Sequence, residues 1–213
     1  MYLRKLYSVK FLLLIISLNF YSIDNYSQDR EIGIFQYPDG IFAAGVKSVD
    51  FKKAIESNDL QKQSMWCWAT CVAMVLRFQN LNVSQEDVVY KAFNRLVNEP
   101  GNGRDMVKGA NGWNYNGKSI RAWIENSRSA KVIIDDLAHK YPLVVGIDNP
   151  GQKIGHAYVL TAIYFKGDIN GTIIPIKIAL RDPWPWPGNK DGRVKMSWRD
   201  FISKVNTIIH VTY

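Results

Sequence analysis

The stretch that decides the fold is QKQSMWCWATC, Gln61 to Cys71. It places Cys67 between Trp66 and Trp68, where the spacing of apolar residues predicts the start of a helix. The chain has only two cysteines, so a thiol between two indoles needs an explanation. Four roles are open: a core residue, half of a disulfide, a metal ligand and a catalytic nucleophile. Each role requires different residues elsewhere in the chain.

Two of these roles fit the sequence poorly. Cys67 and Cys71 lie four residues apart, and on one helix both Cβ atoms lean toward the N-terminus, a poor approach for a disulfide. A structural zinc site takes four Cys or His ligands, and the three histidines are all distant in sequence. We therefore predict no disulfide, no metal and no other cofactor, with Cys71 packed in the helix core.

The N-terminus has the layout of a secretory signal. Basic residues in the first ten positions precede the apolar run FLLLIISLNF, and a polar stretch with serines follows. A membrane span needs roughly 20 apolar residues, so this run is short for one, although an uncleaved single-helix anchor is the alternative. We predict a signal peptide over 1–27, an extension over 28–60 and one domain over 61–213. The protein would then be secreted or periplasmic.

Length and charge limit the functions that remain. At 213 residues and 47% apolar content, the chain can build one substantial core that a cleft divides into two lobes. The signal carries three basic residues and one acidic residue, so its removal lowers the net charge from +8 to +6. The basic residues are scattered rather than interleaved with aromatic residues, so we predict no nucleic-acid partner, and no membrane contact after processing.

Helices are predicted for the first part of the chain. Ser84 is typical of an N-cap, and Asp87 follows three residues later, as at many helix starts. The segment 98–119 is rich in Gly and Asn and predicts a long surface loop beside a site. Residues 28–60 predict irregular structure with one short strand. The expected helices cover residues 67–78, a segment after Ser84, 119–126 and 132–140.

Strands are predicted after Pro142, where apolar and β-branched residues dominate. Helices followed by an antiparallel sheet are typical of an α+β fold. We predict an N-terminal helical lobe, which carries the cysteine helix, packed on a C-terminal antiparallel β-sheet lobe. The expected strands cover residues 143–148, 156–165, 172–182 and 207–213.

One histidine is placed as a catalytic base would be. His156 opens a predicted strand, whereas His139 ends a surface helix and His210 lies inside the last strand. If Phe165 pairs with Ile173 in a hairpin, His156 lies directly opposite Asp182, on the same face of the sheet. A slip of two residues keeps the two side chains on one face, and a slip of one residue separates them. A carboxylate there would orient the imidazole.

These motifs resemble those of the papain-like cysteine peptidases. The sequence carries "Q…WCWA", an isolated "GHA" and a following "DPWP", as in the compact bacterial branch that includes bacteriocin-leader-processing peptidases and secreted effector peptidases. The resemblance covers roughly Gln61 to the C-terminus. It implies a papain-like fold, with Cys67 as nucleophile, His156 as general base and acid, and Asp182 as the orienting residue. The plant and lysosomal enzymes carry Asn where this chain has Asp182.

The resemblance also implies an oxyanion donor. The family places a glutamine shortly before the nucleophile. Gln61 has the usual spacing and Gln63 is the alternative. Core packing and cleft lining are equally open roles for the tryptophans. The indoles that could line the substrate cleft are those of Trp66, Trp68 and Trp184.

The predicted function is that of a secreted cysteine peptidase that cleaves peptide bonds through a thioester with Cys67. The expected partner is a peptide or protein substrate, and the expected state is a monomer. The same three residues could instead serve an acyltransferase, a deamidase or a cell-wall amidase, because water and amines compete for one thioester. An inactive papain-like binding module is the non-enzymatic alternative.

Overall fold

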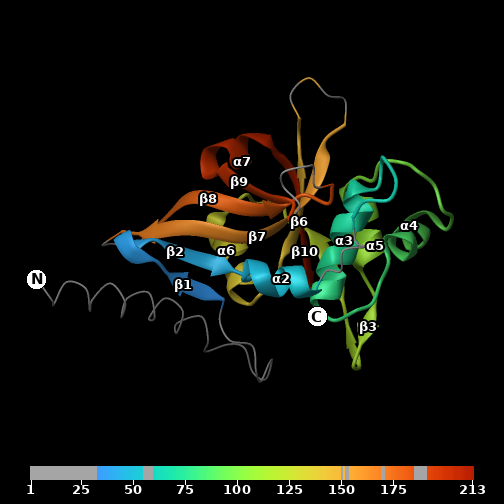
Figure 1. Cartoon of the computed structure of the whole chain (residues 1–213), viewed down its shortest axis with the longest axis horizontal. Coiled ribbons are helices and arrows are strands. Elements are labelled where there is room, and N and C mark those ends of the chain that lie inside the picture. Colours follow the sequence, from blue (N-terminus) through green and yellow to red (C-terminus); the bar gives the residue numbers. More distant parts are fainter. Residues whose placement is uncertain (1–32, 55–59, 150, 152–153, 169–170, 185–190) are drawn as a thin grey trace, which may run out of the picture.

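The protein is described by a computed structural model (Figure 1). It describes residues 33–213 except 55–59, 150, 152–153, 169–170 and 185–190. The predicted signal peptide, residues 1–27, lies outside the described residues. None of the described helices is long and apolar enough to cross a membrane.

One large antiparallel sheet organises the described chain. Its strands run in the order β1-β2-β7-β6-β10-β5, and β8 pairs with β7 on one side and with β9 on the other. A separate small ribbon is formed by β3 (Asn114–Tyr115) and β4 (Lys118–Ser119). The strands of the large sheet are β1 (Ile34–Gln36), β2 (Phe42–Gly45), β5 (Arg121–Ile124), β6 (Leu143–Ile147), β7 (His156–Gly167), β8 (Ile173–Arg181), β9 (Arg193–Ser197) and β10 (Val205–Thr212).

Helices cover both faces of the sheet and enclose two cores. The first core lies on one face of the sheet and contains residues of helices α2, α3, α4 and α5 and of strands β6, β7 and β10. The second core lies on the opposite face and contains residues of α6 and α7. Figure 1 shows α3 and α5 grouped at one end of the sheet and α6 behind it. The helices are α2 (Ser48–Ala54), α3 (Cys67–Phe78), α4 (Gln85–Phe93), α5 (Gly103–Ala110), α6 (Ala130–Ala138) and α7 (Trp198–Lys204), with a 3-10 turn at Pro38–Gly40.

The predicted α+β architecture is confirmed, and so are its main elements. Helix α3 spans the residues expected from their spacing. Helix α4 begins after Ser84, whose side chain accepts from the Asp87 N–H while the Asp87 carboxylate accepts from the Ser84 N–H. Such reciprocal capping satisfies two of the N–H groups that a helix start leaves unpaired. A helical lobe therefore packs on an antiparallel sheet, as predicted.

Three parts of the prediction are wrong. The expected loop 98–119 contains α5, which Asn102 and Asp105 cap reciprocally; this pattern offsets the weak helix preference of its two glycines. The expected helix 119–126 contains the strand β5 instead, and pairing with β10 decides its conformation. The region before Gln61 contains the one short strand that was expected, β2, which pairs with β7, but it also contributes β1 and α2, which were not expected.

The β7–β8 hairpin forms with a register two residues away from the simplest one. Phe165 pairs with Pro175 rather than Ile173, and Val159 pairs with Arg181. Two irregularities, at Leu160/Ala162 and Tyr164/Phe165, shift the pairing by one residue and back again. Because the pairing differs from the predicted one by an even number of residues, the start of β7 and the end of β8 still direct their side chains to the predicted faces of the sheet.

Candidate active site

The Cys67 thiol lies at the first residue of α3, partly buried. Burial raises its pKa, but hydrogen bonds to His156 and to the backbone N–H groups of Ala157 and Trp68, together with the His156 charge, lower that pKa below its usual value. The positive end of the α3 dipole acts in the same direction. The thiol therefore ionises more readily than an ordinary cysteine, as a nucleophilic cysteine requires.

His156 opens β7 and lies between Cys67 and Asp182. Its Nε2 lies 2.8 Å from Asp182 Oδ1, which leaves Nδ1 for the Cys67 thiol. Burial lowers the pKa of His156, but the hydrogen bonds to Asp182 and Cys67 and their charges raise it to about 9. The lowered thiol pKa and the raised imidazole pKa both favour the thiolate and imidazolium forms of the pair.

Asp182 is fixed from several directions and only 8% exposed. Its Oδ1 accepts from His156 and also from the Trp184 N–H at 2.9 Å, and its own N–H donates to Gly192 O at 2.7 Å. Gly192 has φ +60°, and a Cβ there would lie 2.4 Å from Asp182 O. Only glycine fits at that position, so Gly192 allows the close backbone approach that positions Asp182.

Gln61 lies beside these residues, but its amide is already engaged. Its backbone N–H donates to Pro183 O, next to Asp182, at 3.0 Å. Its side-chain Nε2 donates to Gln63 O at 2.7 Å and to Ser64 O at 2.9 Å. Gln63, the alternative oxyanion donor, has an exposed side chain. In this conformation the Gln61 amide closes the turn that leads into Cys67.

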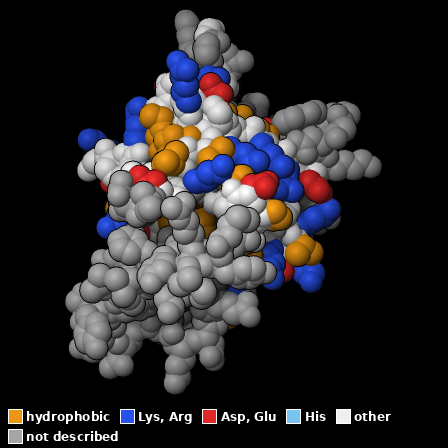
Figure 2. Space-filling model, turned by 90° about the vertical axis from the view of Figure 1, so that its left-hand side faces the viewer, with side chains coloured by type: hydrophobic (Ala, Val, Ile, Leu, Met, Phe, Trp, Pro, Cys, Tyr) orange, Lys and Arg blue, Asp and Glu red, His pale blue; other side chains and the backbone are white. Residues whose placement is uncertain are grey.

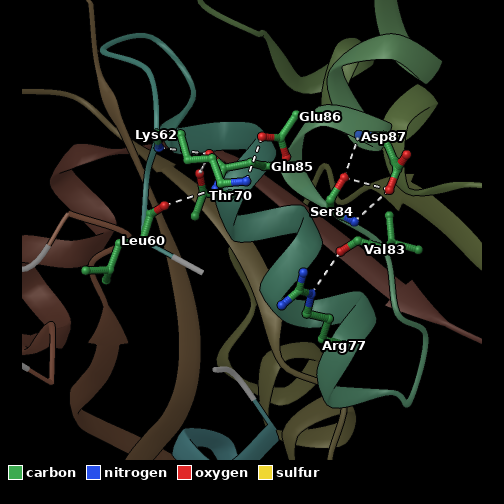
Figure 3. A network of polar contacts seen from close by, with 9 residues as sticks. All are labelled: Leu60, Lys62, Thr70, Arg77, Val83, Ser84, Gln85, Glu86 and Asp87. Carbon is green, nitrogen blue, oxygen red and sulfur yellow. Dashed lines mark hydrogen bonds and ion pairs between the residues drawn. The ribbon is translucent and has the colours of Figure 1, made fainter. Parts of the chain in front are cut away.

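A buried residue absent from the sequence prediction holds that turn against the helices. Gln85, at the start of α4, accepts from Lys62 N and Thr70 Oγ1, both at 3.0 Å, and donates to Leu60 O at 3.0 Å (Figure 3). Lys62 also pairs with Glu86 at 2.7 Å. Gln85 thus ties the chain on both sides of Gln61 to α3. Its partners lie too far away in sequence for a local pattern to reveal them.

The thiol and imidazole open into a cleft of about 460 Å³ between the two lobes. One wall comes from the turn before α3 and from α5, and the other from the sheet. Glycines line both walls, and a Cβ on Gly101 in one wall or on Gly155 in the other would lie within 3 Å of neighbouring protein atoms. Besides Cys67, Trp68 and His156, the lining residues are Ser64, Met65, Pro100, Gly101, Asn102, Gly103, Met106, Gly146, Asn149, Ile154, Gly155, Ala157, Asn206 and Thr207.

The three candidate tryptophans occupy different environments. Trp68 borders the cleft, but its indole is almost fully buried against Phe93 and donates to Glu99 O at 3.2 Å. Trp66 lies in the helical core with its indole N–H on Val97 O, and it is not part of the cleft lining. Trp184 is 53% exposed and also outside the lining. The aromatic contribution to the described cleft is therefore that of Trp68.

The remaining cysteine and histidines lie away from the cleft. Cys71 is a free thiol inside the core, where burial and the charges of Cys67 and Asp182 raise its pKa well above the usual value. His139 caps the end of α6. His210 is 1% exposed, stacked on Trp123. Among the described residues, no three His, Cys, Asp or Glu side chains are grouped so that they could hold a metal ion.

A papain-like cysteine peptidase is the class of protein that this fold and site define. Residues 54–206 match the model of the Peptidase_C39 like family, and the chain belongs to that family. No curated protein matches the chain.

Two solved structures resemble the fold. The peptidase domain of Streptococcus ComA, a bi-functional ABC transporter involved in a quorum sensing pathway, is 17% identical with a TM-score of 0.50. The alignment covers 72% of this chain and 95% of that domain. Digestive procathepsin L2 from the larval midgut of Tenebrio molitor is 14% identical with a TM-score of 0.49, over 93% of this chain and 72% of that one.

Proposed function

We propose that this cysteine peptidase is exported and hydrolyses peptide bonds with Cys67, His156 and Asp182 through a thioester intermediate. The observation that carries the proposal is the position of His156. It is hydrogen-bonded to Asp182 on one side and to the Cys67 thiol on the other, at the edge of an open cleft. A nucleophile, a base and an orienting carboxylate in this order are what acyl transfer to a thiol needs.

The proposed reaction has two halves. The Cys67 thiolate attacks the scissile carbonyl carbon, and the His156 imidazolium gives its proton to the leaving amine as the C–N bond breaks. The neutral imidazole then takes a proton from water, whose oxygen attacks the thioester and releases the thiolate. Asp182 holds the imidazole ring in place and stabilises its cationic form in both halves.

The developing oxyanion needs N–H donors. The backbone N–H of Cys67 lies at the start of α3, where helix geometry supplies no internal acceptor. We propose Gln61 as the second donor. Its Nε2 would exchange the longer of its two hydrogen bonds, to Ser64 O, for the substrate oxygen when a peptide occupies the cleft.

Mass spectrometry of a peptide library, incubated with the chain and a primary amine, tests the reaction. Hydrolysis predicts new free carboxyl termini that incorporate ¹⁸O from labelled water, and a Cys67→Ala chain should give none. Amine-capped products or Gln-to-Glu conversion without cleavage would contradict hydrolysis and favour acyl transfer or deamidation.

Export and quaternary state belong to the same proposal. The basic start and short apolar run of residues 1–27 support a cleaved signal, and we expect a secreted or periplasmic monomer that acts on peptides or proteins. Expression of the full chain in a bacterial host, followed by N-terminal sequencing of the exported product, tests this. A product that stays in the membrane fraction with its first residues intact would contradict it.

A further inference from the structure

One face of the sheet carries a row of cations outside the catalytic cleft. In the β8–β9 register, Arg181 pairs with Arg193 and Ala179 with Lys195, and in the β7–β8 register Tyr164 pairs with Lys177. Paired residues point to the same face of an antiparallel sheet, so these side chains share one surface. The opposite face packs on α6 and α7. In Figure 1 the cationic face is turned toward the viewer, with α6 behind it.

Small residues hollow this surface. Ala43, Gly45, Ala162 and Ala179 line a hollow of about 420 Å³, and their short side chains let larger neighbours form its walls. We call this hollow, with the cations on the same face, the basic trough. Its cationic members are Lys47, Lys177, Arg181, Arg193 and Lys195, and its aromatic members are Phe35, Tyr37 and Tyr164.

The trough is rich in hydrogen-bond donors and poor in negative charge. Its polar lining also includes the hydroxyls of Ser48 and Thr161, and no described residue that lines the hollow is Asp or Glu. Lysines lie over two of its rings, with Lys177 Nζ 4.9 Å from the centroid of Tyr164. At the end of the molecule seen in Figure 2, which is the left-hand end of Figure 1, Lys and Arg side chains lie beside hydrophobic and acidic ones. The lining of the trough is complementary to an anion.

Arg181 anchors the trough. It is only 3% exposed, and its guanidinium donates to Asp191 O and to the backbone and hydroxyl oxygens of Ser48. Its Nε–H has no acceptor among the described residues. Burial and the like charge of Arg193 both lower the pKa of Arg181. Asp191 offers its backbone carbonyl here, while its carboxylate pairs with Lys52 at 2.6 Å. An external carboxylate would relieve the repulsion between the two arginines.

The spacing of the cations indicates the kind of anion. Lys177 and Arg181 lie four residues apart on one strand, which corresponds to about 13 Å. A single phosphate or carboxylate cannot span that distance, whereas an extended chain with several acidic side chains can. The aromatic rings offer apolar surface to the stems of such side chains.

We propose that the basic trough binds an acidic peptide segment, whose carboxylates pair with Lys177, Arg193 and Lys195, while the buried Arg181 adds its positive charge. The further statement that this segment belongs to a substrate rests on the proposed function. Binding to the trough would then hold a substrate on the sheet while another part of it enters the cleft.

Fluorescence anisotropy with the Cys67→Ala chain tests the proposal without any need for activity. The probe is a labelled peptide of alternating Glu and Ser, and its neutral counterpart carries Gln for Glu. The variant is Arg193→Gln with Lys195→Gln, and the matched control is Arg121→Gln with Lys131→Gln, which removes two exposed cations elsewhere. We expect the trough variant to raise the Kd for the acidic peptide about tenfold, and the control pair less than about twofold.

Three results would overturn the proposal: equal losses in both variants, equal binding of the neutral peptide, or complete displacement by inorganic phosphate at the peptide's concentration. A second arm follows cleavage of a substrate with the Glu/Ser extension by the active chain. The trough variant should raise KM and leave kcat unchanged. If the peptide binds as expected and no substrate is cleaved, the proposed peptidase function is wrong, whereas the binding of acidic peptides to the trough is confirmed.

Discussion

Cys67 and Cys71 lie one helical turn apart on α3, and their surroundings give the two thiols opposite chemistry. Cys67 meets an imidazole and two backbone N–H groups at the helix start, which lower its pKa despite burial. Cys71 meets only apolar side chains and nearby negative charge, which raise its pKa. A rise of about 5–6 Å along a helix thus separates a reactive group from an inert one. Reactivity here depends on neighbours rather than on residue type.

The largest effect we predict is the difference between removing one thiol and removing the other. Cys67→Ala should lower kcat/KM for a peptide substrate by about 10⁴-fold or more, because no other nucleophile faces His156. Cys71→Ala should retain activity within about threefold, because the change only empties a small volume in the core. A folded Cys71→Ala chain without activity would contradict the comparison.

The next effect concerns the oxyanion. Gln61→Ala should lower kcat by about 10²–10³-fold with little change in KM, since the amide would act mainly in the transition state. Gln63→Ala is the matched control and should stay within about threefold. A Gln61→Ala chain with a lower melting temperature and an unchanged kcat would show that the amide only closes the turn before Cys67.

The pH dependence of thiol labelling should reveal the ion pair between Cys67 and His156. Iodoacetamide should label Cys67 at pH values below the usual thiol pKa of about 8.5, while Cys71 reacts only after unfolding. Activity should fall as pH rises above about 9, where His156 loses its proton. Asp182→Ala should lower the pKa of His156, raise that of Cys67 and reduce activity at pH 7 about 10- to 100-fold.

Asp182→Asn is the control for that experiment, because Asn keeps an acceptor for His156 but removes the charge. It should retain more activity than Asp182→Ala, with the high-pH limit moved to lower pH. Equal labelling rates for both thiols in the folded wild type would contradict an activated Cys67.

The smallest predicted effect is on the stability that Gln85 provides to the turn before Cys67. Gln85→Leu removes one buried and two partly buried hydrogen bonds and leaves the Thr70 hydroxyl and the Leu60 carbonyl without their Gln85 partner, which should lower the free energy of unfolding by about 1–3 kcal/mol. Glu86→Gln removes only a partly exposed ion pair and should cost less than about 1 kcal/mol. Urea denaturation measures both, and equal losses would contradict a special role for Gln85.

Local sequence patterns predicted the elements that carry their own signals. Apolar spacing located α3, and the Ser84–Asp87 pair located the start of α4. The prediction that His156 and Asp182 lie on the same face of the sheet needs only the alternation of side chains along each strand. It therefore remains correct although the register differs by two residues. The register itself depends on two strand irregularities that pair counting does not reveal.

What the sequence could not reveal depends on distant partners. Residues 121–124 become β5 because β10 is there to pair with them, and tertiary pairing overrides a weak local preference. Gln85 looks like an ordinary first residue of a helix until Leu60 and Lys62 reach it. The Gln61 amide shows the same limit, since its spacing indicates a donor but not that both its hydrogens are already bound.

The hydrogen bond from the Asp182 N–H to Gly192 O also closes the base of the connection between β8 and β9. Arg181 reinforces that closure through Asp191 O, so the two strand ends are tied before the intervening chain begins. The pairing of the two strand ends and the position of the Asp182 carboxylate therefore depend on the same two contacts.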